Sequence, residues 1–196
     1  MNTQVLLRNL LVLKDESINQ HQSRVKLYAG LLSYLVRPSI SEVAIVASSQ
    51  HDIGKIGTVH DVLNKPGKLT PEEWLLMKQH PVLGAEIIEK ANGGIGLNSD
   101  LLLVVLAVRH HHERWDGKGY PDGLRGEEIP LASRIIAVAD AFDAMTSERP
   151  YRKAMSEDAA LREILRCAGT QFDPVLAEMF LKIICNNVVP SCAAGC

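Results

Sequence analysis

Residues 130–145 read PLASRIIAVADAFDAM, and this stretch decides the fold. Pro130 can open a helix, and the apolar side chains after it predict a buried helix that runs through Asp140 to about Met145. Asp140 interrupts the apolar face of that helix. A carboxylate on such a face must be paired or coordinated, because burying it bare costs too much free energy. Taken alone, Asp140 is either an ion-paired structural residue or a metal ligand, and Asp143, on nearly the same face, is placed to orient a ligand.

The segments on either side of this helix also have helical patterns. Apolar residues between Val25 and Val36 recur at helical spacing, and a helix over about residues 99–112 is apolar on all sides and expected to be buried. Residues 115–130 hold four glycines and two prolines and predict one long loop. Further helix starts are indicated at Ser41, whose helix is expected to run to His51, at the predicted capping box Thr70-Pro71-Glu72-Glu73, at Ser156 and at Asp173-Pro174. Alternating strand patterns are absent, so the sequence predicts an all-α single domain.

The composition excludes several classes of protein. The 196 residues are 46% hydrophobic and 22% charged, with a mean hydropathy of +0.03, which excludes a mainly disordered chain. The longest apolar run, Leu101–Val108, is too short for a membrane span, and the net charge of −2 does not favour binding to a nucleic-acid polymer. The first residues form no signal peptide, and the four cysteines form no C-x-x-C pair. We therefore expect a cytoplasmic protein with reduced thiols and no membrane partner.

Residues that can bind a metal recur along the apolar helix faces at even spacing. The candidates are His21, His51, Asp52, His80, His111, His112 and Asp140. Gaps of 30, 28, 31 and 28 residues separate them in turn, each about one helix plus a return connection. Successive helices can therefore bring these side chains to one level of a bundle, which is how metal sites in helical bundles are built. The mixture of imidazole and carboxylate suits iron, manganese, zinc or nickel better than calcium or magnesium.

His51 and Asp52 open the short sequence His51-Asp-Ile-Gly-Lys55. Adjacent side chains at a helix end diverge by about 100°, so these two residues can meet different ions, or Asp52 can bridge two. Lys55 lies three residues after Asp52, close enough to contact a phosphate or a metal-bound water. The remaining two histidines are interpreted as surface residues. His60 is expected in a loop, and His110 is expected at a solvated helix end.

These residues, in this order, resemble the HD-GYP family of phosphodiesterases, a branch of the HD metal-dependent phosphohydrolases. The matching segments cover about residues 17–185 and stand as His21-Gln-Ser-Arg-Val25, His51-Asp-Ile-Gly-Lys55-Ile-Gly57, Lys65-Pro-Gly-Lys-Leu-Thr-Pro-Glu-Glu73, Met77-Lys-Gln-His80, His111-His-Glu-Arg-Trp-Asp-Gly-Lys-Gly-Tyr-Pro121, Ile129-Pro-Leu131, Val138-Ala-Asp140-Ala-Phe-Asp-Ala-Met-Thr-Ser147, Arg149-Pro-Tyr-Arg152 and Phe172-Asp-Pro174. The Gly119-Tyr120-Pro121 element separates this branch from other HD proteins. The resemblance implies an HD-type helical bundle with an inserted Gly/Pro-rich loop that carries this element.

The resemblance also implies an activity, which is hydrolysis of the bacterial second messenger cyclic di-GMP to the linear dinucleotide pGpG, to GMP, or to both. It implies a cluster of two or three transition-metal ions, often iron or manganese with zinc or nickel as further options, held by the seven candidate ligands. A hydroxide that bridges two metals would attack the phosphodiester. Asp52 and Lys55 map onto catalytic positions, and further positions that contact the substrate map onto Tyr120, Arg149 and Arg152.

One departure from the family pattern bears on the number of metal ions. Some members carry a glutamate four residues before the first histidine, where it helps to hold a third ion, and here that position is Ser17. We therefore expect two ions, about 3.5 to 4 Å apart, that share Asp52. One ion is assigned to His21, His51 and Asp140, and the other to His80, His111 and His112.

A second departure keeps alternatives open. After Ile56-Gly57 the family usually shows Ile-Pro-Asp, and here the sequence is Thr58-Val59-His60. The alternatives are a sensor that binds cyclic di-GMP without hydrolysing it, and a hydrolase of mixed cyclic GMP-AMP. Residues 17–185 are predicted to form the catalytic domain, residues 1–16 a helical extension and residues 186–196 a tail. The Leu-rich extension leaves open a signalling partner or a homodimer.

Overall fold

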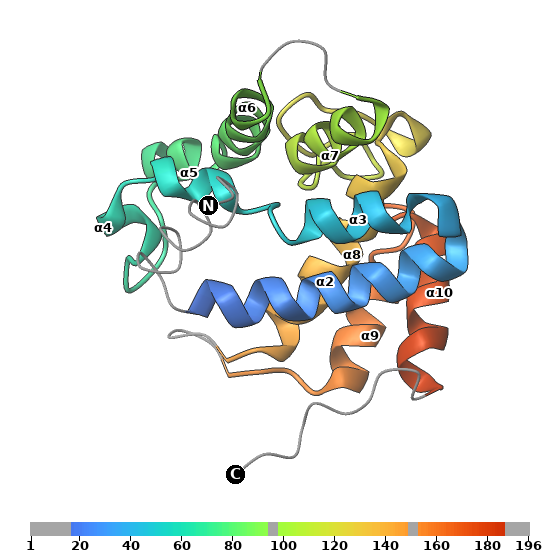
Figure 1. The fold of residues 1–196 in the computed structure, drawn as a ribbon. Helices are drawn as coiled ribbons and strands as arrows, with labels where there is room; N and C mark the ends of the chain where they lie inside the picture. The colour runs from blue at the N-terminus through green and yellow to red at the C-terminus, as the bar shows by residue number, and fades with distance from the viewer. Residues whose placement is uncertain (1–16, 94–97, 149–152, 187–196) are drawn as a thin grey trace.

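The computed structural model describes residues 17–93, 98–148 and 153–186 (Figure 1). The predicted extension over residues 1–16, the predicted substrate contacts Arg149 and Arg152, and the tail beyond residue 186 lie outside these residues. Within the described ranges the chain forms helices and no strand, and one isolated bridge joins Ala168 to Phe172. The predicted all-α fold is therefore confirmed.

The helices follow one another with short connections, and three of them are short 3-10 helices, labelled η. In chain order the described elements are α2 (Ser17–Val36), η1 (Pro38–Ile40), α3 (Ser41–Ser48), η2 (Ile53–Gly57), α4 (His60–Leu63), α5 (Pro71–Met77), α6 (His80–Ala91), α7 (Ser99–Arg109), η3 (Gly126–Glu128), α8 (Leu131–Thr146), α9 (Glu157–Arg166) and α10 (Pro174–Cys185). The α8 bounds agree with the helix predicted after Pro130.

Helix α8 lies between two halves of the hydrophobic core. On one side, Val138 and Phe142 pack with buried residues of α2, α9 and α10. On the other side, Ala132 and Ile136 pack with buried residues of α3, α6 and α7. Figure 1 shows α2 and α3 side by side in front of α8, with α6 and α7 above them. Because α8 contacts both halves, Asp140 on this helix is carried to the place where they meet.

Several helix starts agree with the sequence prediction. The Thr70 side chain accepts the amide of Glu73, and the Glu73 side chain accepts the amide of Thr70, so the capping box at α5 is complete. Ser156 caps α9 through its side chain. Asp173 caps α10 in the same way, just before Pro174.

Helix α3 is shorter than predicted. It begins at Ser41 itself, after the N-cap residue Ile40, and it ends at Ser48 rather than at His51. The Nδ1–H of His51 donates to the carbonyl of Ser48 at 2.7 Å, a local bond that competes with continuation of the helix. The chain therefore turns after Ser48, and the turn carries His51 and Asp52 toward α6.

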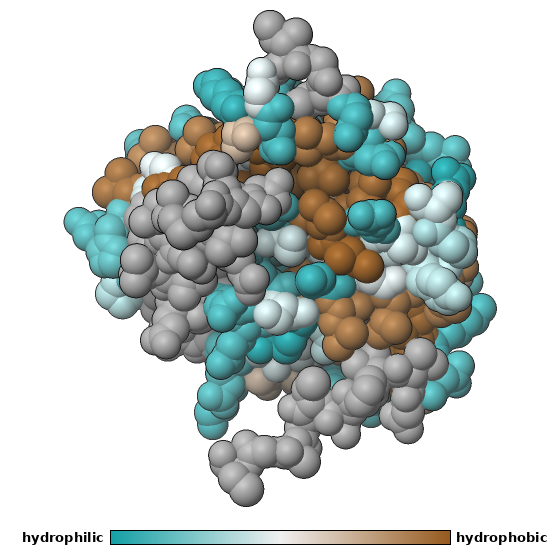
Figure 2. Space-filling model, viewed as in Figure 1, coloured by the Kyte–Doolittle hydropathy of each residue, from teal (hydrophilic) through white to brown (hydrophobic). Residues whose placement is uncertain are grey.

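Helix α7 is buried on one face only. Leu102 and Leu103 are 48% and 38% exposed, so the prediction of a helix buried on all sides is wrong, and the helix ends at Arg109. It packs against α3, α6 and α8, and Figure 2 shows apolar surface over α3 and α7. None of the helices in the described ranges combines the length and the apolar character that a membrane-spanning segment needs.

Candidate metal centre

The predicted metal ligands lie close together where several helical elements meet. Their positions are His21 in α2, His51 and Asp52 in the turn between α3 and η2, His80 at the start of α6, His111 and His112 just after α7, and Asp140 in α8. Six of them form two groups of three, and within each group the ligand atoms all lie within 4.8 Å of one another. Residues far apart in the sequence are thus brought together as their spacing predicts.

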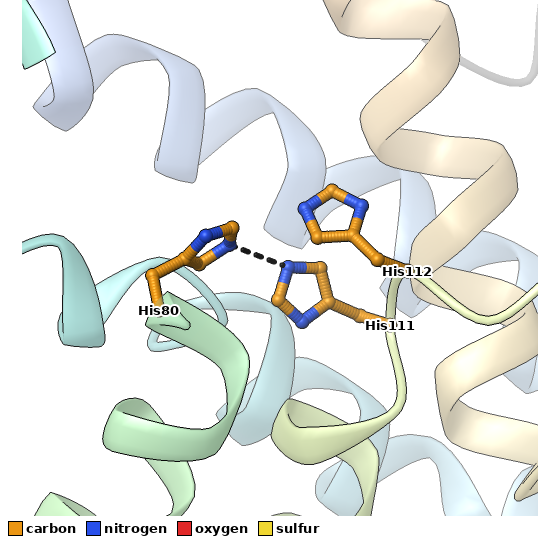
Figure 3. Close-up of side chains that lie close together, drawn as sticks. All are labelled: His80, His111 and His112. Carbon is orange, nitrogen blue, oxygen red and sulfur yellow. Dashed lines mark hydrogen bonds between the residues drawn. The ribbon is translucent and has the colours of Figure 1, made fainter. Parts of the chain in front are cut away.

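The first group is formed by His80, His111 and His112 (Figure 3). Figure 3 shows the three rings gathered between the start of α6 and the end of α7. His80 and His111 are buried, and their Nε2 atoms lie 3.3 Å apart. Imidazole nitrogens that converge in this way are a common donor set for transition-metal ions.

Backbone carbonyls determine which nitrogen of each ring faces the site. The Nδ1 atoms of His51, His80 and His111 each lie 2.7 Å from the carbonyl oxygen of the residue three positions earlier. Each Nδ1–H donates to that carbonyl, so in the neutral ring Nε2 carries the free lone pair. Histidines that bind metals are typically held by such a hydrogen bond from the other ring nitrogen.

A cation accounts for two features of these rings. Burial, above all, lowers the pKa of His80 to about 3 and the pKa of His111 well below its usual value, so both rings are neutral near pH 7. Their Nε2 lone pairs then face each other across 3.3 Å with no proton between them, an arrangement that a cation makes favourable. The Nε2 atom of His51 is buried and has no hydrogen-bond partner in the described part of the chain. The residues present therefore fit a metal ion.

The second group is formed by His21, His51 and Asp140. Oδ1 of Asp140 lies 3.3 Å from Nε2 of His21 and 3.9 Å from Nε2 of His51. Asp52 lies between the two groups: its Oδ1 is 3.4 Å from Nε2 of His80, and its Oδ2 is 3.5 Å from Nε2 of His51 and 3.7 Å from Nε2 of His21. A carboxylate with one oxygen toward each group can bridge two ions. Metal binding by these residues stays a prediction.

Asp143 holds His21 from the side away from the site. Its Oδ2 accepts a hydrogen bond from Nδ1 of His21 at 2.7 Å, and its carboxylate also accepts from the guanidinium of Arg24. Since the Asp143 side chain is 1% exposed, these two donors satisfy a charge that water does not reach. Asp143 thus has the contact expected of an orienting residue. The sequence reasoning missed Arg24, whose partner lies 119 positions away.

The carboxylates draw positive charge to the second group. Burial acts to lower the pKa of His21, but hydrogen bonds with Asp140 and Asp143 raise it to about 9. Burial acts to raise the pKa of Asp52, but Lys55 and the surrounding histidines hold it well below its usual value, so this carboxylate is ionised near pH 7. A field that favours a proton on His21 also favours a metal cation in place of that proton.

Gly54 lets η2 pack directly against the start of α6. A Cβ at this position would lie 1.9 Å from the carbonyl oxygen of His80 and 2.6 Å from the amide nitrogen of Gly84. Only glycine allows such a close approach of two backbones, and this approach keeps Asp52 within reach of His80. Lys55, the next residue, donates to Oδ2 of Asp52 at 2.7 Å.

The loop over residues 115–130 folds back onto the first group, and η3 is its only helical turn. Tyr120 stacks on His112, with ring centres 4.9 Å apart and ring planes inclined by 30°. Gly119 passes so close to the preceding backbone that a Cβ there would lie 2.4 Å from the amide nitrogen of Arg114. Burial, with the nearby carboxylates adding to it, raises the pKa of Tyr120, so its hydroxyl stays protonated and can donate a hydrogen bond.

Two further residues anchor this loop. His110, predicted at a solvated helix end, is 6% exposed and its Nε2 lies 2.9 Å from Oδ2 of Asp122, so that prediction is wrong. Glu113 is buried, and its Oε1 accepts the amides of Asp122 at 2.7 Å and Gly123 at 3.0 Å. His60 is exposed as predicted, although it begins α4 rather than lying in a loop. In the sequence, the buried His110 is indistinguishable from the two histidines that follow it.

Comparison with known proteins identifies the family. The model of the HD domain family matches residues 5–176. The chain belongs to the HD domain family. A relative from Vibrio cholerae named "Cyclic di-GMP phosphodiesterase" is 43% identical over 151 residues, which are 77% of this chain and 31% of the relative. A second from the same organism, named "3'3'-cGAMP-specific phosphodiesterase 2", is 34% identical over 178 residues, which are 90% of this chain and 33% of the relative.

A solved structure supports the same fold for this HD domain. It is an HDG"Y"P protein from Bdellovibrio bacteriovorus, similar with a TM-score of 0.66 at 18% identity, over 87% of this chain and 53% of that one. The HD-GYP resemblance predicted from the motifs is confirmed by these comparisons. The chain spans between 31% and 45% of the length of the curated relatives it matches.

Proposed function

We propose that this HD domain is a metal-dependent phosphodiesterase that hydrolyses cyclic di-GMP to pGpG, to GMP, or to both. The observation that carries the proposal is the pair of candidate ligand groups, one of three histidines and one of two histidines and Asp140, with the Asp52 carboxylate between them. Relatives at 43% and 42% identity that are named cyclic di-GMP phosphodiesterases support it.

Two divalent transition-metal ions, iron or manganese, are the proposed cofactor. The residues that would hold them are His80, His111 and His112 for one ion, His21, His51 and Asp140 for the other, and Asp52 for both. When bound, the ions supply Lewis acidity that activates water and offsets the negative charge that builds up on the phosphate. Zinc and nickel are the other metals that this donor set accepts.

The protein's own groups keep this centre in place before substrate arrives. Backbone carbonyls hold three of the imidazoles with Nε2 turned inward, and Asp143 holds the ring of His21. Lys55 donates to Asp52 and keeps it ionised, which maintains the acceptor that both groups share. The Lys55 side chain is 24% exposed, so its ammonium can also reach a phosphate oxygen of a bound substrate.

Substrate contacts are proposed for Lys55, Tyr120, Arg149 and Arg152. Tyr120 lies against His112 with its hydroxyl protonated, so it can donate to a phosphate oxygen beside the first group. The two arginines lie outside the described residues. They are three positions apart in the sequence and offer bidentate donors to phosphate oxygens.

The test is product analysis on cyclic di-GMP. Protein purified anaerobically and loaded with manganese or ferrous iron should release pGpG or GMP, while chelated protein and the Asp52→Asn variant should not. Circular dichroism of the variant checks that the fold is retained. Fully metal-loaded wild-type protein that releases neither product contradicts the proposal, and binding of cyclic di-GMP without turnover would select a sensor instead.

A second candidate substrate is mixed cyclic GMP-AMP. The observation that favours it is the 34% identity to a relative named "3'3'-cGAMP-specific phosphodiesterase 2". The kcat/KM values for the two cyclic dinucleotides, measured with one preparation, decide between them. A kcat/KM at least tenfold higher for cyclic GMP-AMP would reassign the substrate and leave the metal centre unchanged.

A further inference from the structure

Helix α5 and the C-cap residue that follows it carry a tryptophan and a lysine to the rim of the metal centre. Nζ of Lys78 lies 5.5 Å from the centre of the Tyr120 ring and 5.8 Å from the Trp74 ring. Tyr120 in turn stacks on His112, a member of the first group. A chain of contacts therefore leads from a candidate metal ligand through Tyr120 and Lys78 to Trp74.

The charge of Lys78 is not neutralised by any residue in the part of the chain that the structure describes. Within the described ranges, no carboxylate lies within ion-pair distance of its ammonium, and the side chain is half-buried. Glu73, five positions before Lys78, pairs instead with Lys65 at 2.6 Å. Contacts with two aromatic rings stabilise an ammonium but leave it able to bind an anion.

Trp74 presents a large aromatic face to solvent. Its side chain is 45% exposed, whereas tryptophan is highly buried on average. The capping box at Thr70 and Glu73 fixes the start of α5, so the indole is carried on an ordered helix. Figure 2 shows apolar surface over this helix, at the left of the view. An exposed indole on a rigid support is a suitable platform for stacking a nucleobase.

We propose that Trp74 and Lys78 form a subsite for the part of the substrate that is not being cleaved. Lys78 binds the second phosphate of the cyclic dinucleotide, and Trp74 stacks on a nucleobase. The subsite rests on the proposed function, because it assumes that one phosphate of a cyclic dinucleotide lies at the candidate metal centre. In a cyclic dinucleotide the second phosphate lies across the ring from the first, and Lys78 is separated from His112 by a single aromatic ring.

The test compares two substrates of different size. Bis(p-nitrophenyl) phosphate offers one phosphodiester, no nucleobase and no second phosphate, so it reports on the metal centre alone. Cyclic di-GMP engages both the metal centre and the subsite. Trp74→Ala and Lys78→Met should each raise KM for cyclic di-GMP about tenfold, with kcat changed less than about twofold, and should leave hydrolysis of bis(p-nitrophenyl) phosphate unchanged. Trp74→Phe and Lys78→Arg should restore most of the loss. Leu75→Ala, at an exposed neighbouring position of α5, is the matched control and should behave as wild type.

Binding gives a readout that does not depend on turnover. In a Trp115→Phe background Trp74 is the only tryptophan, and cyclic di-GMP should quench its fluorescence upon binding to the manganese-loaded protein. Lys78→Met should shift that titration to about tenfold higher ligand concentration. Wild-type affinity and KM in both Trp74→Ala and Lys78→Met would overturn the subsite while leaving the proposed function intact. Absence of cyclic di-GMP turnover by the wild type contradicts the proposed function, and if quenching still occurs the subsite stands as a binding site.

Discussion

Replacing Gly54 by alanine tests how the fold builds the site. The added Cβ would lie 1.9 Å from the carbonyl oxygen of His80, 2.6 Å from the amide nitrogen of Gly84 and 2.9 Å from the carbonyl carbon of His80. All three atoms belong to the backbone, so no side-chain rotation relieves the contact. Either η2 or the start of α6 must move. Asp52 directly precedes η2, and His80 is the first residue of α6.

The expected cost is large for a single methyl group. Overpacking a core costs typically 1–3 kcal/mol, and the obstruction here is backbone, so we expect the free energy of unfolding to fall by about 3 kcal/mol. For a chain of this size that corresponds to a Tm lower by roughly 6–12 °C. Separation of Asp52 from His80, now 3.4 Å apart between Oδ1 and Nε2, should also lower the metal content of the purified protein.

The assay is thermal and urea unfolding with metal analysis of the same samples, and Gly30→Ala is the matched control. A Cβ at Gly30 meets only the flexible side chain of Ile45, at 3.2 Å, and alanine favours the α2 helix, so the free energy of unfolding should change by less than about 1 kcal/mol. Gly54→Ala protein with wild-type Tm and full metal content would refute the reasoning that this glycine sets the approach of η2 to α6.

Three other perturbations follow from the contacts around the site. Asp143→Asn should weaken manganese binding about 10- to 100-fold in a calorimetric titration, because His21 loses the carboxylate that orients it, and unchanged affinity would contradict that role. Glu113→Ala leaves the amides of Asp122 and Gly123 without their acceptor, so urea unfolding should show a loss of about 2–3 kcal/mol, whereas a loss below about 0.5 kcal/mol would mean that other contacts hold the loop. Chelation should lower the Tm, and manganese at about 100 times its Kd should restore about 2.7 kcal/mol of stability; a Tm that does not respond to verified metal removal would contradict metal binding by the folded state.

The centre of the fold follows from local sequence signals. The α8 segment is a mainly apolar helix that carries two carboxylates, and both its helical state and the need to satisfy Asp140 follow from the residues themselves. The regular spacing of His21, His51, His80 and His111 equals one helix plus its return, so bundle geometry alone brings these side chains to one level.

Other features depend on contacts between distant residues and could not be predicted in this way. His110, His111 and His112 are identical in sequence, and the direction of the chain after α7 decides that the first bonds to Asp122 while the other two face the site. Arg24 gains its role from Asp143 on another helix. Apolar periodicity cannot show which face of α7 the neighbouring helices cover, so the sequence alone does not predict that Leu102 is exposed.

The end of α3 could not be predicted from apolar periodicity alone. Its apolar residues predict a helix that runs to His51, but a side-chain hydrogen bond from that histidine to the carbonyl of Ser48 favours a turn. Tertiary contacts decide between the helix and the turn, here the packing of Gly54 against α6.

The central claim is that two metal ions bind between these helices and share Asp52. Anomalous diffraction from crystals of manganese-loaded protein tests it most directly. We expect two anomalous peaks with the Asp52 carboxylate between them. One should lie within coordination distance of His80, His111 and His112, and the other within coordination distance of His21, His51 and Asp140. A single peak, a third peak beside Ser17, or two peaks with Asp140 turned away from both would contradict it.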